Sequence, residues 1–267
     1  MFRNLTLKTL HDSKRALIGW AIGLAATSLT MMAFYPSVKS SAPALDRYME
    51  QMSAEMKALF MGASSDYWSP AGYLHTELFV FMFPLLFAVY TVGAGSRAIA
   101  GEEDRGTLDL LLSTPITRAS VVVHKTVAIT VVTFALGLAT WAGLIVGGMT
   151  VGFDLSALRM AQATVAVVLL GLMFGALALA VGCATGNRGL AIAIPAVVGV
   201  AGYLLDTLAP FTSWLKPYRK LSPFYYYSAS MPVKNGLVGL HVVVLVGLFV
   251  VFVWIAVLAV RRRDLHT

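Results

Sequence analysis

Charged residues are scarce in this sequence, and their scarcity excludes an ordinary soluble domain. Only 12% of the 267 residues are Asp, Glu, Lys or Arg, whereas a typical soluble protein has roughly 25%. Hydrophobic residues make up 58% of the chain. They gather in continuous runs, and a helix of about 20 such residues crosses a hydrocarbon core of about 30 Å. The composition therefore predicts a membrane protein.

Several motifs of catalysis and cofactor binding are missing as well. No Gly-Lys dipeptide occurs, so the chain lacks the G-x-x-x-x-G-K-[ST] loop that binds ATP phosphates. Neither H-E-x-x-H nor an Asp-Asp pair occurs, and the five histidines are scattered. Cys183 is the only cysteine, which excludes an intramolecular disulfide. We expect no catalytic residue, metal or cofactor in this chain.

Six apolar runs are long enough to span a membrane. Each run is continuously apolar, which favours helices over the alternating strands of a barrel. We expect an all-α polytopic membrane protein with a single transmembrane domain over residues 1–267. The expected spans are residues 16–35, 78–98, 121–151, 161–185, 190–210 and 237–260.

The distribution of Lys and Arg predicts which side the termini occupy. With six spans both termini share a side, and twelve of the 20 Lys and Arg residues flank the spans on that side. Cytoplasmic flanks carry the excess of positive charge in membrane proteins. We therefore expect both termini in the cytoplasm. The same bias accounts for much of the net charge of +7, so we expect no nucleic-acid partner.

Two polar segments flank the first span. Residues 1–15 are basic and weakly amphipathic, and they form either a helix on the inner interface or a frayed leader. The outer loop over residues 36–77 holds an apolar stripe at helical spacing, which predicts an amphipathic helix. Its Met49, Met52 and Met56 are candidate substrate contacts, because methionine adapts to varied apolar surfaces; packing against the membrane domain is the alternative.

The outer segment 211–236 is rich in aromatic residues. Four prolines between positions 210 and 232 break any long helix, and Trp and Tyr rings are typical of the headgroup boundary. We expect a re-entrant or interfacial hairpin. Phe224, Tyr225 and Tyr226 are candidate substrate or gate residues, and an aromatic anchor without a role in transport is the alternative.

Ionisable residues are nearly absent from the middles of the spans. Carriers driven by protons or sodium usually hold charged or polar ligands there. Their absence predicts that the energy for any transport comes from another protein.

The cytoplasmic segment 99–118 contains the stretch "GEEDRGTLDLLLSTP", four charges followed by a leucine cluster. Thr107 is a plausible N-cap, Leu108, Leu111 and Leu112 share one helix face, and Pro115 ends the helix. Such an apolar patch needs a docking partner. A short helix that docks on a partner protein is one interpretation, and an interfacial helix on lipid headgroups is the other.

This stretch resembles the loop after the second span in type 2 ATP-binding-cassette (ABC) exporter permeases, E-x-x-x-G-T-L-x-x-L-L-x-x-P-x-x-R followed by Lys. The residues that match are Glu102, Gly106, Thr107, Leu108, Leu111, Leu112, Pro115, Arg118 and Lys125. The phrase "LSPFYYY...P..NGL" before the last span is similar to the outer hairpin of such permeases.

The resemblance implies a bacterial plasma-membrane exporter subunit that moves a drug, antibiotic, peptide or lipid. A separate ATPase subunit with its ATP and Mg would grip the loop as a coupling helix, and a second permease, identical or homologous, would complete the membrane part. The implied coupling residues are Glu102, Glu103, Arg105, Gly106, Thr107, Leu108, Leu111, Leu112, Pro115 and Arg118. The alternatives are a membrane-embedded enzyme acting on lipids or peptides and a secondary transporter.

Overall fold

The computed structural model of the chain is a bundle of long helices. It describes residues 5–41, 51–53, 56, 67–104, 106 and 117–262, and within them it contains no strand. Six helical segments are long and apolar enough to span a membrane, which confirms the predicted all-α class and number of spans. These segments are Leu5–Ser40, Pro70–Ala98, Arg118–Thr150, Ala157–Thr185, Arg188–Phe211 and Gly239–Arg262.

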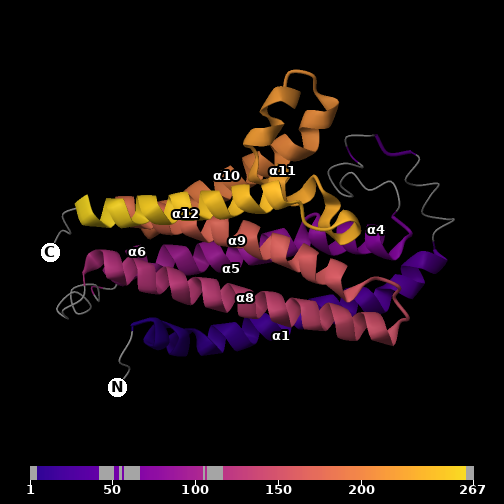
Figure 1. Cartoon of the computed structure of the whole chain (residues 1–267), viewed down its shortest axis with the longest axis horizontal. Helices are drawn as coiled ribbons and strands as arrows, with labels where there is room; N and C mark the ends of the chain where they lie inside the picture. Colours follow the sequence, from indigo (N-terminus) through magenta and orange to yellow (C-terminus); the bar gives the residue numbers. More distant parts are fainter. Residues whose placement is uncertain are drawn as a thin grey trace.

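The long helices lie side by side along the longest axis of the molecule (Figure 1). Helix α1 packs along α8, whereas α5, α10 and α12 each pack against α9. Both chain ends lie at the same end of the bundle, here named the terminal end; the opposite end is the far end. The helices are α1 (Leu5–Ser40), α5 (Met82–Ala98), α8 (Arg118–Thr150), α9 (Ala157–Thr185), α10 (Arg188–Leu208) and α12 (Gly239–Arg262).

Short helical segments join the long helices. Two of them, α4 (Pro70–Leu74) and the π-helix η1 (His75–Phe79), lead into α5, and α6 (Ala100–Glu103) follows it. Residues 209–236, which lie between α10 and α12, are named the hairpin; part of it projects sideways from the bundle in Figure 1. The hairpin contains η2 (Ala209–Phe211), η3 (Lys216–Leu221), α11 (Pro223–Ser228) and η4 (Met231–Asn235).

Local signals in the sequence set several helix ends. The side chains of Thr117, Ser156 and Asn187 each accept a hydrogen bond from a backbone N–H in the first turn of α8, α9 and α10. Such N-caps satisfy donors that the helix itself leaves free. Helix α9 ends at Gly186, whose φ of +67° lies in the left-handed region that glycine adopts without strain.

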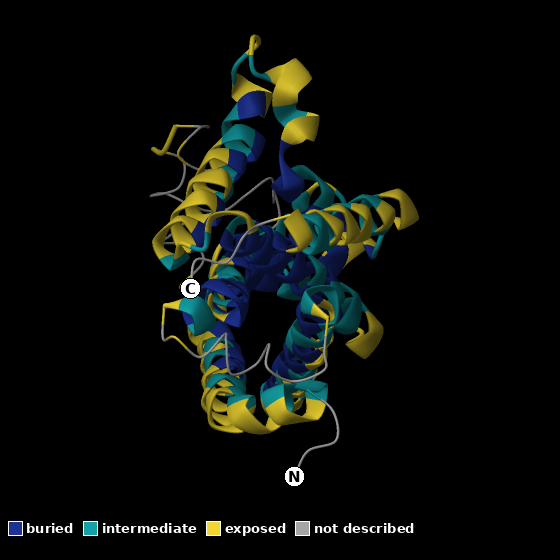
Figure 2. Cartoon of the chain, turned by 90° about the vertical axis from the view of Figure 1, so that its left-hand side faces the viewer, coloured by how far each residue is buried: buried dark blue, intermediate teal, exposed yellow. Residues whose placement is uncertain are grey.

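The core of the bundle is built around α9. In the most apolar window of this helix 78% of residues are buried, against 11% in α12, although α12 is the more hydrophobic of the two by mean hydropathy. Buried residues gather at the centre of the end-on view and exposed ones on the outside (Figure 2). Hydrophobicity therefore does not decide which helix is central.

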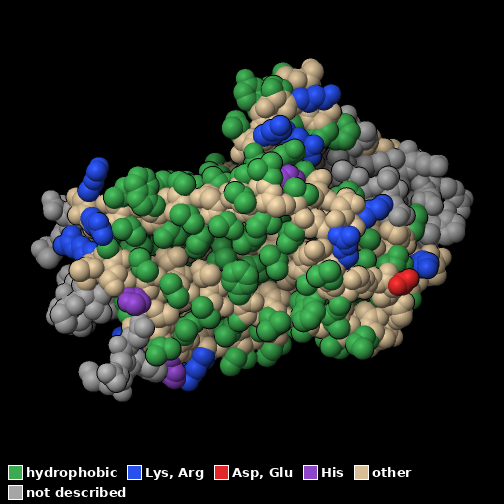
Figure 3. Space-filling model, viewed as in Figure 1, with side chains coloured by type: hydrophobic (Ala, Val, Ile, Leu, Met, Phe, Trp, Pro, Cys, Tyr) green, Lys and Arg blue, Asp and Glu red, His purple; other side chains and the backbone are tan. Residues whose placement is uncertain are grey.

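The sides of the bundle carry a broad hydrophobic surface. In Figure 3 hydrophobic side chains cover the middle of the visible face, and Lys and Arg lie towards the two ends and on the hairpin. A band of this kind matches the hydrocarbon core of a bilayer with charged headgroup regions on either side.

The described part of the N-terminal leader belongs to α1. From Leu5 onwards it is helical and continuous with the first span, since α1 runs without a break to Ser40. Its side chains also contact α8, where the Thr6 hydroxyl lies 2.8 Å from Nδ1 of His124. Residues 5–15 are therefore the first turns of a long helix that extends past the apolar run.

The predicted methionine helix of the 36–77 loop falls mostly outside the described residues. Within them, residues 51–53 are not helical, and Met52 and Met56 are exposed. The predicted amphipathic helix over the rest of this loop stays a prediction. Helical structure also enters the far part of this loop earlier than expected, with α4 starting at Pro70 behind the N-cap Ser69.

Candidate functional site

The corner between α5 and α8 lies at the terminal end and contains the predicted coupling segment. Helix α5 stops at Ala98, and the chain bends at Ile99, whose φ of −123° and ψ of −60° interrupt the helix. The carbonyl oxygen of Ile99 accepts the backbone N–H groups of Glu102 and Glu103, at 3.0 Å each. Ile99 is buried in a small apolar cluster formed with α8, α9 and α12, and the next residue, Ala100, is fully buried as well. The corner is thus firmly attached to the bundle.

An ion pair joins α6 to α8. The Glu102 Oε1 atom lies 3.0 Å from Nζ of Lys125, and the two side chains are 27% and 12% exposed. A pair that is largely removed from water is less screened than one on a free surface. Both residues belong to the matched loop pattern, and the structure brings them together across 23 positions of sequence.

The edges of the coupling loop are described, and its centre is not. Gly106 donates its N–H to the Glu103 carbonyl and has a φ of +65°, and no atom of the described residues comes within 4 Å of where its side chain would stand. Thr117 caps α8, and Arg118 is its first residue. The predicted short helix stays a prediction, because Arg105, Thr107, Leu108, Leu111, Leu112 and Pro115 lie outside the described residues.

An apolar cavity of about 400 Å³ lies between α5 and α10. Its walls come mainly from successive turns of these two helices, and Phe174 of α9 and Phe224 of the hairpin complete them. Ligand pockets of this size are typically apolar with few polar groups. The lining residues are Val80, Phe81, Pro84, Leu85, Ala88, Val89, Val92, Gly93, Phe174, Ile192, Pro195, Ala196, Gly199, Val200, Tyr203, Leu204 and Phe224.

The structure separates the three aromatic residues that the sequence grouped as a gate. Phe224 lies at the cavity, with its ring 5.8 Å from that of Phe174 and 5.6 Å from that of Tyr203. Tyr225 and Tyr226 instead contact His241 of α12, at 5.7 Å between ring centroids in both cases.

The candidate methionines do not join this aromatic group. Met52 and Met56 are 39% and 44% exposed, whereas Phe224 is 8% exposed against α9 and α10. Met49 lies outside the described residues.

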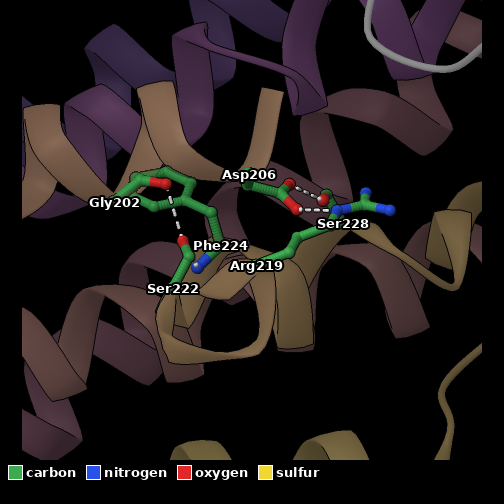
Figure 4. Close-up of polar contacts among 6 residues, drawn as sticks. All are labelled: Gly202, Asp206, Arg219, Ser222, Phe224 and Ser228. Atoms are coloured by element: carbon green, nitrogen blue, oxygen red, sulfur yellow. Dashed lines mark hydrogen bonds and ion pairs between the residues drawn. The ribbon is translucent and has the colours of Figure 1, made fainter. Parts of the chain in front are cut away.

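A polar cluster fastens the hairpin to α10 (Figure 4). Nε of Arg219 donates to Oδ1 of Asp206 at 2.8 Å, and the Ser228 hydroxyl donates to Oδ2 at 2.6 Å. The Ser222 hydroxyl donates to the Gly202 carbonyl at 2.7 Å. Asp206 is only 7% exposed, so its charge needs these donors. The hairpin is therefore fixed to the end of the helix that lines the cavity.

Two tyrosines outside the spans are held as hydrogen-bond donors. The buried Tyr227 hydroxyl donates to the Phe79 carbonyl at 2.6 Å, and burial raises the pKa of Tyr227. The Tyr67 hydroxyl donates to Oε1 of Glu77 at 2.6 Å; burial first, and then this carboxylate, raises the pKa of Tyr67. Both phenols stay neutral at physiological pH, and they connect the hairpin and the segment before α4 to η1.

The cavity and the Asp206 cluster were not singled out from the sequence. A signal was present in each case: Pro84 and Pro195 sit inside apolar runs, and Asp206 is an acid near a span end with Arg219 shortly after it. The proline pair lies on the two cavity walls. Within the described residues no group of three or more His, Cys, Asp or Glu side chains could hold a metal ion.

Comparison with known families gives a match over almost the whole chain. The model of the family described as "ABC-2 family transporter protein" matches residues 3–265. A search of curated proteins finds no match. Six apolar helices and a helical corner with the loop pattern agree with the family match. The chain thus belongs to the ABC-2 transporter family, as a permease component that works with an ABC ATPase.

Proposed function

We propose that this permease moves a hydrophobic or amphipathic substrate out of the cytoplasm. The main support for this proposal is the apolar cavity between α5 and α10, which lies within the hydrophobic part of both helices. A hydrophobic substrate can move from lipid into such a cavity without leaving polar wall groups unpaired, as it would in a polar cavity. The substrate class includes drugs, antibiotics, peptides and lipids.

The proposed topology puts the terminal end in the cytoplasm. The supporting observation is the excess of Lys and Arg in the flanks at this end, ending with Arg261, Arg262 and Arg263. The coupling corner lies at the same end as the chain termini. The ATPase then binds from the cytoplasm, as a protein without membrane spans must do. The membrane is the bacterial plasma membrane.

The proposed energy source is ATP hydrolysis on the partner subunit, which also holds the Mg. Only Ile99 separates α6 from α5, so a displacement of the corner passes directly into α5. The ion pair between Glu102 of α6 and Lys125 of α8 transmits part of the same displacement to α8. Because α5 forms one wall of the cavity, the motion changes the cavity. A second permease, identical or homologous, completes the membrane part.

Transport in inverted membrane vesicles tests this function. The permease is reconstituted with its co-purifying ATPase, and a bis-benzimide dye, which fluoresces in lipid, serves as the probe. We expect the fluorescence to fall only when ATP is added, with no effect of a protonophore. Dye movement that follows a proton gradient without ATP contradicts the proposal and favours a secondary transporter.

A further inference from the structure

The hairpin carries a concentrated positive charge. Its residues 209–236 include four Lys or Arg and no Asp or Glu. Lys216 and Lys220 are exposed on the short helix η3. The neighbouring acid Asp206 is already held by Arg219 and Ser228, so it is not available to these two lysines.

Large apolar side chains surround these lysines. Trp214 is 69% exposed, Tyr218 is 54% exposed and Leu221 is 76% exposed. Lys, Trp and Tyr together are typical of segments at the membrane interface, where rings sit among headgroups and ammonium groups reach phosphates. Residues 211–221 are named the hairpin tip.

The length of α10 puts the hairpin tip at the level of the headgroups. The helix has 21 residues, and at about 1.5 Å per residue it is about as long as the hydrocarbon core is thick. The hairpin begins where α10 ends and projects sideways from the bundle (Figure 1). Since the long helices run along the membrane normal, this direction is parallel to the membrane surface. The tip therefore lies over lipid.

The charge of the tip runs against the usual bias. On the topology proposed above, the tip is on the side where Lys and Arg are depleted, yet Lys216, Arg219 and Lys220 stand within five positions there. Figure 3 shows blue side chains gathered on the projecting hairpin. A positive cluster on this side, next to exposed rings, indicates a specific negative partner.

We infer that the hairpin tip binds the headgroups of anionic phospholipids, phosphatidylglycerol being the simplest. Lys216 and Lys220 contact the phosphates, and the rings of Trp214 and Tyr218 enter the interface beside them. The pairing of Arg219 with Asp206 sets the orientation of the tip. The inference rests on the topology proposed above but not on export itself, because lipid binding needs neither ATP nor substrate.

Lipid-specific quenching tests the inference on the full-length permease. Ser213 is exposed next to Trp214, and Cys183 is buried, so a Cys183→Ala, Ser213→Cys chain takes a bimane label at the tip alone. The labelled protein is reconstituted in phosphatidylcholine vesicles with about one third phosphatidylglycerol. In paired samples only one of the two lipids is brominated on the upper part of its acyl chains. The ratio of quenching, corrected for lipid fraction, gives the enrichment of phosphatidylglycerol at the tip.

We expect phosphatidylglycerol to be enriched severalfold at the tip and the enrichment to fall in about 0.5 M salt, since ionic strength screens exposed charges. Lys216→Gln with Lys220→Gln is expected to bring the ratio close to one, because it removes the two exposed ammonium groups that attract the anionic headgroups. Lys8→Gln with Lys14→Gln is the matched control, because it removes the same charge at the terminal end, and it should leave the ratio unchanged.

Two results would overturn the inference. The first is equal quenching by the two lipids around the unmodified tip. The second is quenching by neither lipid, which means that protein, such as a second permease, covers the tip. Both lysines are exposed and lie outside the bundle core, and a monodisperse elution profile of the double variant confirms that it folds.

Discussion

The two sides of α5 differ in how they pack. On one side its backbone touches α9: a side chain on Gly95 would collide with the Gly175 carbonyl oxygen, and one on Gly175 would come within 2.9 Å of Thr91. On the other side α5 faces α10 across a cavity of about 400 Å³. Small residues let helices approach closely in a membrane, where apolar surface alone gives no preference for another helix over lipid. From this difference we expect α5 and α9 to move together and α10 to move relative to them.

The largest expected effect comes from Gly95→Ala, which disrupts the close contact between α5 and α9. The added methyl group would overlap the Gly175 carbonyl, so the helices must separate. We expect a loss of about 3 kcal/mol in unfolding free energy, measured by detergent-titrated unfolding followed through tryptophan fluorescence.

Gly93→Ala is the matched control on the side of α5 that faces the cavity. The nearest neighbour of the added methyl group would be Nη2 of Arg97, at 3.6 Å. Equal losses in Gly95→Ala and Gly93→Ala would show that the two sides of α5 do not differ.

The next effect concerns the side of α5 that faces α10 across the cavity. Here the hairpin is fixed to the end of α10. Asp206→Ala removes the acceptor of Arg219 and Ser228, and we expect it to cost about 2 kcal/mol locally. Limited trypsin digestion at the Lys and Arg residues of η3 should then be faster. Asp154→Asn, which changes an exposed acid outside the hairpin, serves as the control. Unchanged digestion of Asp206→Ala would mean that the cluster does not hold the hairpin.

Filling the cavity is expected to affect transport rather than folding. Ala196→Phe places a ring in the space between α5 and α10, and we expect ATP-dependent dye transport to fall about tenfold, equal to about 1.4 kcal/mol. The neighbouring Val197 is 67% exposed and does not line the cavity, so Val197→Phe should transport normally. If both variants transport equally well, the cavity is not on the substrate path.

The smallest expected effect lies at the terminal end of α5. Glu102→Gln weakens the ion pair with Lys125, and we expect a loss of about 1 kcal/mol in stability. The loss should shrink at high salt, as a charge interaction does. Asp104→Asn, at an exposed position of the same corner, controls for charge alone. A larger loss in Asp104→Asn than in Glu102→Gln would contradict the role of the pair.

The spans could be predicted from the sequence because each is a continuous apolar run. Their ends could not be placed well where a polar residue has a partner: the second span starts at Pro70 and includes Glu77, whose carboxylate accepts a hydrogen bond from the Tyr67 hydroxyl. The basic leader was separated from the first span by its charges, yet the same residues are good helix formers and extend α1.

The site was predictable in part. The loop pattern singled out Glu102 and Lys125, but only the fold places them 3.0 Å apart. For the cavity the sequence offered only Pro84 and Pro195 inside apolar runs, because the other residues that line it resemble those that face lipid. Phe224 was grouped with Tyr225 and Tyr226 by sequence, whereas the helical turn of α11 directs the Phe224 side chain to α9 and α10 and the two tyrosines to α12.

The most direct test of coupling is to purify the tagged permease from its native membrane in mild detergent and identify the proteins bound to it. The account predicts an equimolar P-loop ATPase, which is lost when Glu103→Arg is combined with Leu111→Asp and retained in the cavity variant Ala196→Phe. An ATPase that stays bound to the Glu103→Arg, Leu111→Asp permease and still drives transport would contradict the assignment of the 99–118 corner as the coupling site.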